Sequence, residues 1–306
     1  MQNTLKSTVV FKGNGLHSGR PSCMVVYPAS AEHGIWFRRT DIGLGDAMIP
    51  AMWDAAEHTN LCTRLANTSG VSVSTVEHAM AALAGCGIHN ALIEINGPEV
   101  PILDGSSAPF VRAFVKCGLR RLAAPVRALQ VVKPVTVQKG EASATLHPAD
   151  GLKIDFTIDF SDPAIGVQSM SLDLANGAFA RELCDSRTFC RISDIKVMRT
   201  QGLALGGTLE NAVVIDGDAI LSPGGLRHKN EAVRHKMLDV LGDLTLAGGP
   251  LLGHYIGHKA GHTLTNRLLW ALFETPGAVR MITCSPEMAA RLPGAGLVPD
   301  EVPQAA

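Results

Sequence analysis

The chain has 306 residues, of which 46% are hydrophobic and 18% charged, and its formal net charge is −1. This composition is typical of a globular protein of one large or two ordinary domains, and the near-neutral charge without a basic block argues against a nucleic-acid groove. The N-terminal segment MQNTLKSTVVFKGNGLHSG has no long apolar core, and no stretch reaches about 18 apolar residues in a row. We therefore expect a cytoplasmic protein with no integral membrane segment. Seven cysteines without a C-x-x-C pair predict neither a disulfide framework nor a cysteine zinc knuckle.

The first third of the chain reads as short strands followed by a helix. Residues 8–19 (TVVFKGNGLHSG) and 34–41 (GIWFRRTD) are typical of strands punctuated by glycine. Residues 74–85 (STVEHAMAALAG) predict a helix in which Ser74 and Glu77 form a capping box and Gly85 ends the helix. A strand, a turn region rich in proline and glycine, and a second helix from about residue 109 follow.

The second half begins with strands, of which residues 152–160 (LKIDFTIDF) alternate apolar and polar side chains. Further on, three histidines are spaced four apart, which on a helix would make a metal ladder: His254, His258 and His262. A glycine directly precedes each of them, at a cost of about 1 kcal/mol each in a helix. We expect instead a strand through residues 255–256, a turn at Gly261 and a helix from about Thr263, which leaves His262 near a helix start.

Strands and helices mix without regular alternation along the chain, and this predicts an α+β fold in two domains. The segment around residues 119–137 separates one set of strands and helices from another, so we place the boundary near residue 125. The predicted N-terminal domain is 1–125, the C-terminal domain is 126–290, and residues 291–306 form a loose tail.

One predicted helix, residues 233–244 (VRHKMLDVLGDL), carries an unusual polar face. His235, Asp239 and Asp243 fall within an arc of about 80°, with Lys236 at its edge and apolar residues opposite. A solvated face is the ordinary alternative, but such faces favour long Lys, Glu and Arg side chains. The His-x3-Asp pair instead places two metal-competent groups one turn apart.

A second pair of chemically competent residues, Glu77 and His78, stands at the start of the first predicted helix. Taken alone, Glu77 is an ordinary capping residue and His78 is incidental. Combined with His235 and Asp239, however, His78 would complete a site with three protein ligands, which is how catalytic zinc keeps a fourth position for water.

Seven segments together carry a resemblance to a known family. They are GNGLHSG, GIWFRRTD, LCTRL, STVEHAMAALAGCGIHNALIEINGPEVPILDGSSAPFV, SRTF, VRHKMLDVLGDL and KAGHTLTN. In order and approximate spacing they resemble the UDP-3-O-acyl-N-acetylglucosamine deacetylases, which take the first committed step of lipid A synthesis in Gram-negative bacteria. The resemblance implies two α+β domains of similar topology, with helices sandwiched between two β-sheets and the active site between the domains.

The resemblance also implies a Zn²⁺ site and the residues around it. Its metal ligands match His78, His235 and Asp239. The family's general base matches Glu77, and its second catalytic residue matches His262. The carboxylate that orients this second residue matches Asp243, and the hydroxyl donor to the oxyanion matches Thr188. Whether Glu77 alone or a Glu77/His262 pair moves the protons stays open, as does the choice between Zn²⁺ and Fe²⁺.

For the substrate, a UDP-linked acylated glucosamine, the resemblance implies a further set of contacts. Lys236 matches a basic residue near the diphosphate, and the remaining positions are Asp159, Phe160, Phe189 and His17. The acyl chain is expected in a hydrophobic passage near residues 186–207 (SRTFCRISDIKVMRTQGLALGG). We expect the chain to act as a monomer.

Two other functional classes compete with this interpretation. A zinc amidohydrolase or esterase for another acylated sugar or peptide would use the same metal residues. The second alternative is a binding protein with a structural metal, or a non-catalytic relative. Glu77, Thr188 and His262 together argue against it, since a structural site is more often closed by four protein ligands. The departures from the family pattern, among them Cys190 after Phe189 and Ala232 before VRHK, touch no proposed ligand.

Overall fold

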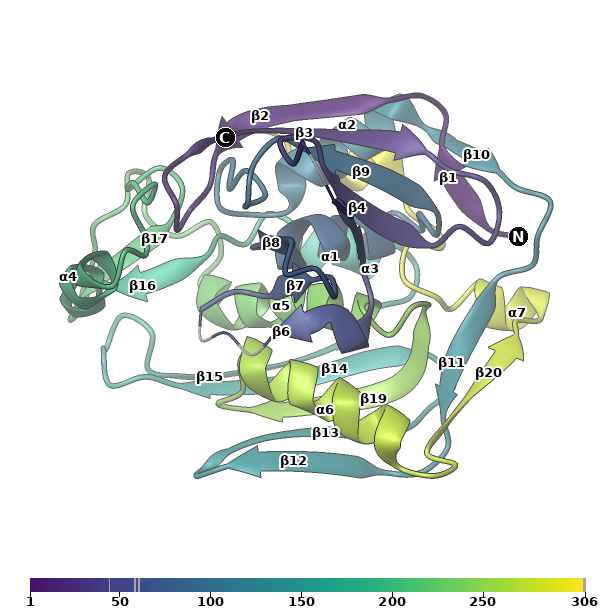
Figure 1. The fold of residues 1–306 in the computed structure, drawn as a ribbon. Coiled ribbons are helices and arrows are strands. Elements are labelled where there is room, and N and C mark those ends of the chain that lie inside the picture. The colour runs from purple at the N-terminus through teal and green to yellow at the C-terminus, as the bar shows by residue number, and fades with distance from the viewer. Residues whose placement is uncertain (44, 58, 60, 305–306) are drawn as a thin grey trace.

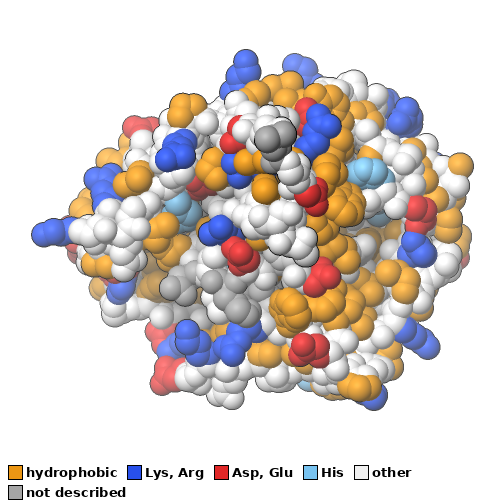
Figure 2. Space-filling model, viewed as in Figure 1, with side chains coloured by type: hydrophobic (Ala, Val, Ile, Leu, Met, Phe, Trp, Pro, Cys, Tyr) orange, Lys and Arg blue, Asp and Glu red, His pale blue; other side chains and the backbone are white. Residues whose placement is uncertain are grey.

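The computed structural model describes residues 1–304 apart from residues 44, 58 and 60. Two β-sheets form outer layers, and the main helices lie between them (Figure 1). The structure thus confirms the predicted α+β class with helices sandwiched between two sheets. Figure 2 shows hydrophobic side chains that run from the top of this face down to its lower part, to the right of the centre.

The first sheet comes from the N-terminal third of the chain, and its strand order is β2-β3-β9-β4-β5. In strand β3, alternate side chains are buried against the helices, as the period of two predicts. The five strands are β2 (Val9–Asn14), β3 (Pro21–Pro28), β4 (Ile35–Arg39), β5 (Met48–Pro50) and β9 (Ala91–Ile95).

The second sheet has seven strands, all from the part of the chain after residue 126. Strand β14 shows the alternation that the sequence predicts, with Leu152, Ile154, Phe156 and Ile158 all buried. The seven strands are β11 (Arg127–Val131), β12 (Val135–Lys139), β13 (Ala142–Pro148), β14 (Leu152–Asp159), β15 (Val167–Asp173), β19 (Leu251–His258) and β20 (Val279–Thr283).

The two sheets repeat one topology. In the first, β3 and β9 are antiparallel, β9 and β4 parallel, and β4 and β5 antiparallel. In the second, β13 and β19 are antiparallel, β19 and β14 parallel, and β14 and β15 antiparallel. The expected similarity of the two halves is therefore confirmed by their pairing, although no internal repeat is visible in the sequence.

Each half contributes two helices to the middle layer, one before and one after its central strand. They are α1 (Glu77–Gly85) and α2 (Ala108–Cys117) around β9, and α5 (Glu231–Thr245) and α6 (His262–Glu274) around β19. Helices α1 and α5 pack backbone to backbone, because a Cβ atom at Gly242 would lie 2.1 Å from the Glu77 carbonyl oxygen. Only glycine permits this approach.

Smaller elements surround this core. Helix α4 projects with β16 and β17 beyond the two sheets, at the left of Figure 1. The shorter strands are β1 (Asn3–Leu5), β6 (Ala56–Glu57), β7 (Arg64–Ala66), β8 (Ser72–Ser74), β10 (Leu119–Arg121), β16 (Phe189–Arg191), β17 (Val213–Asp216) and β18 (Ala219–Ile220). The shorter helices are α3 (Ala178–Glu182), α4 (Ile192–Thr200), α7 (Pro286–Ala289) and the 3₁₀ turns Trp53–Ala55 and Pro299–Glu301.

Several sequence predictions of local structure are confirmed. The second helix begins at Ala108, one residue before the expected start. The segment with three histidines forms strand β19 up to His258 and helix α6 from His262, so the metal ladder is absent as expected. In the described part of the chain, no helix combines the length and apolar composition that crossing a membrane requires.

The capping box at the start of α1 was a wrong prediction. Ser74 is the last residue of β8, and Thr75 has a φ of 57°, so the chain turns sharply before the helix begins. The N-cap residue is Val76, and the described residues contribute no side-chain cap there. The Glu77 carboxylate does not reach back to cap the helix. It accepts a hydrogen bond from the Thr63 backbone amide instead.

The C-terminal segment is also more ordered than the sequence suggested. Leu292 and Val302 are buried, and Arg112 donates a hydrogen bond to the Pro303 carbonyl. The predicted loose tail is therefore held to the body of the protein at these points, although several of its residues are exposed, and 305–306 lie outside the described residues. The domain boundary near residue 125 stays a prediction.

Candidate metal centre and active site

Helices α1 and α5 bring the predicted metal ligands together. His78 stands in the first turn of α1, and His235 and Asp239 stand one turn apart on α5. Their three ligand atoms lie within 4.8 Å of one another, and all three residues are buried. Asp239 Oδ1 is 3.3 Å from His235 Nε2 and 3.7 Å from His78 Nε2. The sequence prediction of this grouping therefore agrees with the geometry.

The donor set fits a divalent metal ion. Asp239 Oδ1 is buried and has no hydrogen-bond partner among the described residues, although two imidazole nitrogens face it. Burying a carboxylate oxygen without a hydrogen-bond partner costs free energy unless a cation binds to it. Two imidazoles and one carboxylate form the ligand set of a catalytic zinc site with an open position.

The protonation of His235 suits a metal ligand. Burial lowers the pKa of His235 to about 4, against the raising effect of Asp239, so its imidazole is neutral at pH 7. Its Nδ1 lies 3.0 Å from the Ser186 carbonyl oxygen, and a neutral ring must donate this hydrogen bond from Nδ1–H. The Nε2 lone pair then faces Asp239 Oδ1, which leaves it available to a metal ion, and the carbonyl fixes the ring orientation.

Glu77 lies beside the three residues that could hold a metal ion. Its Oε1 is 3.7 Å from His262 Nε2, and its Oε2 accepts a hydrogen bond from the Thr63 amide at 3.0 Å. Burial raises the pKa of Glu77, while His262 and His78 oppose that shift. A carboxylate with a raised pKa in a buried cluster is suited to accept a proton near neutral pH.

His262, at the first position of α6, forms a buried pair with Asp243. Its Nδ1 lies 2.9 Å from Asp243 Oδ2, and its Nε2 lies 3.7 Å from Asp239 Oδ2. Burial alone would lower the pKa of His262, but Asp243, Asp239 and Glu77 raise it to about 9. The imidazole is therefore cationic at neutral pH, and its Nε2 proton faces the cluster.

Lys236 lies closer to the predicted metal ligands than its predicted role suggested. Its Nζ is 2.6 Å from Asp239 Oδ2, and this contact joins a cation to the carboxylate whose other oxygen faces the two imidazoles. Burial would raise the pKa of Asp239, but His235 and Lys236 hold it well below its usual value. A contact of Lys236 with a diphosphate stays a prediction.

Of the other residues predicted for the substrate, Phe160 and Phe189 lie beside the buried cluster, and Asp159 lies next to Phe160 in the chain. The ring of Phe189 packs edge-on against both His235 and Phe160, with centroids 6.2 Å and 5.4 Å apart, so these two rings continue from the metal cluster. Thr188 directly precedes Phe189, and its backbone amide donates a hydrogen bond to the Gly105 carbonyl oxygen. Asp159 ends β14 and pairs with Lys259, 2.8 Å away, at a more exposed position.

His17 is buried in the loop that follows β2, against the segment after α4. Its carbonyl accepts a hydrogen bond from the Leu205 amide, and its Nε2 has no partner among the described residues. The buried Glu99 carboxylate holds this loop by accepting hydrogen bonds from the amides of His17 and Ser18. Glu99 was missed in the sequence, where it is one acidic residue in a turn region.

Thr63 is the second residue that sequence reasoning missed. Its hydroxyl donates a 2.5 Å hydrogen bond to Asp243 Oδ1, and its amide holds Glu77. Asn266 donates to the same hydroxyl oxygen from α6, at 3.2 Å. The segment LCTRL, one of the seven that carry the resemblance, was the available signal, but nothing in it distinguishes Thr63 from an ordinary strand residue.

Comparison with known proteins agrees with this geometry. A family model described as LpxC, UDP-3-O-acyl N-acetylglycosamine deacetylase, matches residues 2–274. The chain belongs to this family. All the residues of the buried cluster lie inside the matched part of this LpxC-family chain.

Three relatives illustrate the similarity, and each is named UDP-3-O-acyl-N-acetylglucosamine deacetylase. A protein of Phenylobacterium zucineum is 45% identical over 288 residues, which cover 94% of this chain and 98% of the relative. One of Shewanella frigidimarina is 41% identical over 300 residues, 97% of each chain. One of Anaeromyxobacter is 44% identical over 303 residues, 98% of each chain. This LpxC-family chain thus matches its relatives along almost their whole length.

The Thr63 hydroxyl provides a direct test of the buried network. We expect Thr63→Val to lower the free energy of unfolding by about 1–3 kcal/mol, because Asp243 Oδ1 loses its donor in a buried place. Thr63→Ser keeps the hydroxyl and serves as the matched control, with a loss of about 1 kcal/mol for one methyl group. Urea unfolding measures both, and equal losses in the two variants would contradict the assigned hydrogen bond.

Proposed function

We propose that this chain is a Zn²⁺-dependent deacetylase that hydrolyses the N-acetyl group of UDP-3-O-[(3R)-3-hydroxyacyl]-N-acetylglucosamine to the free amine and acetate. This would be the committed step of lipid A biosynthesis. The observation that carries the proposal is one buried cluster, in which Glu77 and His262 adjoin three metal-competent side chains in a chain of this family.

His78, His235 and Asp239 would hold the metal ion. When bound, Zn²⁺ supplies a water whose pKa falls from about 16 toward 7, and it polarises a substrate carbonyl. The choice of zinc rests on the two imidazoles and one carboxylate, which suit a borderline-soft ion better than an all-oxygen site would.

Glu77 would act as the general base. Its Oε2 is fixed by the Thr63 amide, so Oε1 is the oxygen left to accept the proton of the attacking water. The raised pKa of Glu77 brings it closer to that of the proton donor, which favours transfer near neutral pH. After attack on the acetamide carbon, the protonated Glu77 could also donate its proton to the leaving amine.

His262 would donate a proton to the amine as its bond to the acetyl carbon breaks. The Asp243 carboxylate keeps the imidazole cationic and orients Nε2 toward Glu77 and Asp239. Glu77 could instead move both protons, with His262 only stabilising the negative charge of the transition state. The two schemes differ in whether His262 has to lose its proton during turnover.

The remaining predicted residues would bind the rest of the substrate. The Thr188 hydroxyl would donate to the developing oxyanion, because Thr188 lies between Ser186, which holds His235, and Phe189, which packs on it. Phe160, Asp159 and Lys236 would contact the nucleotide and diphosphate. The acyl chain would lie along α4, where Ile192 and Val197 are exposed. A monomeric state and a cytoplasmic location remain predictions.

Metal removal tests the proposed reaction and cofactor together. We expect acetate release from the UDP-linked 3-O-acyl substrate to vanish after chelation and to return with about one equivalent of Zn²⁺, because the cluster offers one three-ligand site. Metal content after dialysis gives a second readout, in which His235→Gln should lose the bound ion. No acetate from a folded, zinc-loaded chain would contradict the substrate and favour another amidohydrolase reaction.

The pH profile distinguishes the two proton schemes. Because the pKa of His262 is raised to about 9, its acid form is present below that pH and is lost as the pH rises through it. We expect kcat to fall above pH 9 in the unmodified chain and this basic limb to disappear in His262→Ala, at an activity lower by about 100-fold or more. Glu77→Ala should keep the basic limb in its residual activity. An unchanged limb in His262→Ala would assign both proton transfers to Glu77.

A further inference from the structure

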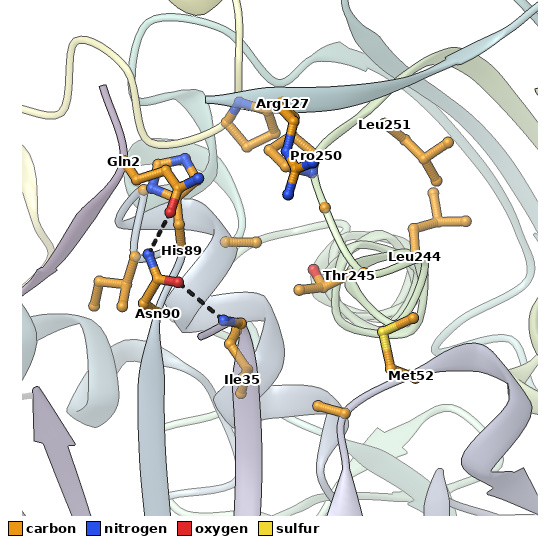
Figure 3. Close-up of a pocket in the computed structure, with 18 of the residues that line it drawn as sticks. Gln2, Ile35, Met52, His89, Asn90, Arg127, Leu244, Thr245, Pro250 and Leu251 are labelled. Atoms are coloured by element: carbon orange, nitrogen blue, oxygen red, sulfur yellow. Dashed lines mark hydrogen bonds between the residues drawn. The ribbon is translucent and has the colours of Figure 1, made fainter. Parts of the chain in front are cut away.

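A cavity of about 380 Å³ lies between the two halves of the molecule, away from the metal cluster. Its walls come from the end of α1, the C-terminal half of α5, strand β4 and the start of β19. In Figure 3, Gln2, His89 and Asn90 line one side, and Leu244 and Leu251 face them from the other. The volume falls in the range of roughly 300–1,000 Å³ that is typical of small-molecule sites.

The cavity and the metal cluster lie on different faces of α5. Leu241 and Leu244 line the cavity, and they point about 200° and 140° away from Asp239 around the helix axis. None of the predicted catalytic, metal-binding or substrate-binding residues lines the cavity, and neither does the segment 186–207. The cavity is thus separate from the proposed site of deacetylation.

Most of the cavity wall is apolar. Gln2, His89, Asn90 and Arg127 form its polar end, and Thr245 stands apart on the side of Leu244 (Figure 3). The apolar part includes Met52, Leu241, Leu244 and Leu251. Gln2 and Asn90 form part of the polar wall, but they satisfy each other and the neighbouring backbone. They therefore leave little hydrogen-bonding capacity for a ligand, and other groups must supply it.

Two donors remain available at the polar end. His89 Nδ1 accepts a hydrogen bond from the Asn3 amide, so the neutral ring carries its proton on Nε2, for which the described residues provide no acceptor. Burial lowers the pKa of His89 to about 4, which keeps the ring neutral at pH 7. Arg127 donates to Glu32 through one terminal nitrogen, and the described residues accept no hydrogen bond from its other side-chain N–H groups.

We propose that this cavity binds a small amphiphile with an unbranched apolar body and one terminal carboxylate, such as a medium-chain fatty acid. The apolar body lies against Met52, Leu244 and Leu251, and the carboxylate accepts hydrogen bonds from His89 Nε2 and Arg127. The Arg127–Glu32 pair is half-exposed, with 51% and 42% of the two side chains accessible, so it is a weak ion pair that leaves the guanidinium open to a second carboxylate.

Calorimetric titration of the full chain with octanoate, and with 1-octanol as the uncharged analogue, tests this proposal. We expect saturable binding of octanoate and at least tenfold weaker binding of octanol, because only the carboxylate forms charge-assisted hydrogen bonds. Arg127→Gln should weaken octanoate binding about tenfold and leave octanol unchanged. Arg280→Gln, an exposed arginine of the neighbouring strand β20 that does not line the cavity, is the matched control and should change neither.

Two further variants locate the ligand and test the sign of the charge effect. Ala84→Leu fills space in the cavity and should abolish octanoate binding, whereas Ala84→Ser should retain it. Glu32→Gln removes a negative charge beside the carboxylate and should tighten octanoate binding about threefold. Absence of saturable binding, equal affinity for octanol, or binding unaffected by both Arg127→Gln and Glu32→Gln would overturn the proposal. If Ala84→Leu does not fold, Arg127→Gln and Glu32→Gln still decide between the two outcomes.

Discussion

Helices α1 and α5 meet at the backbone level, where Gly242 packs on the Glu77 carbonyl, and the rest of the site depends on this contact. A longer separation would move Glu77 and His78 away from the ligands on α5. The close approach instead places residues of both halves within one buried cluster. Because the two halves share one sheet topology, these helices occupy equivalent positions before their central strands, and the site lies where the two repeats join.

The buried charges of the cluster are organised so that most of them have a partner. Asp243 receives hydrogen bonds from Thr63 and His262, and Lys236 contacts one oxygen of Asp239. Removing one partner from such a network leaves a charge unpaired in a place with little water, which is more costly than losing a surface ion pair. The other oxygen of Asp239 is the exception, and this exception is the strongest structural sign of a metal.

Much of the site could be predicted from residue type and spacing. Helical periodicity places His235 and Asp239 on one face, but that pair alone is weak evidence of a site. The combination with His78, and then the order of the seven segments, made the cluster with Glu77 and His262 a specific prediction. Thr63 and Glu99 could not be found in this way, because each acts through hydrogen bonds to distant loops and helices that only the folded chain brings near. The capping box failed for a related reason, since the left-handed turn at Thr75 removes Ser74 from the helix start. The repeated topology could not be seen in the sequence, because it is defined by the pairing of backbone strands and not by the identity of side chains.

The proposed reaction depends on a metal ion that would be held between two helices from different halves of the chain. Anomalous scattering measured at the zinc edge from crystals of the zinc-loaded chain would locate that ion directly. We expect a single strong peak within about 2.0–2.2 Å of His78 Nε2, His235 Nε2 and an oxygen of Asp239, with Glu77 outside the coordination sphere. A peak elsewhere, or one in which Glu77 replaces one of these ligands, would contradict the proposal.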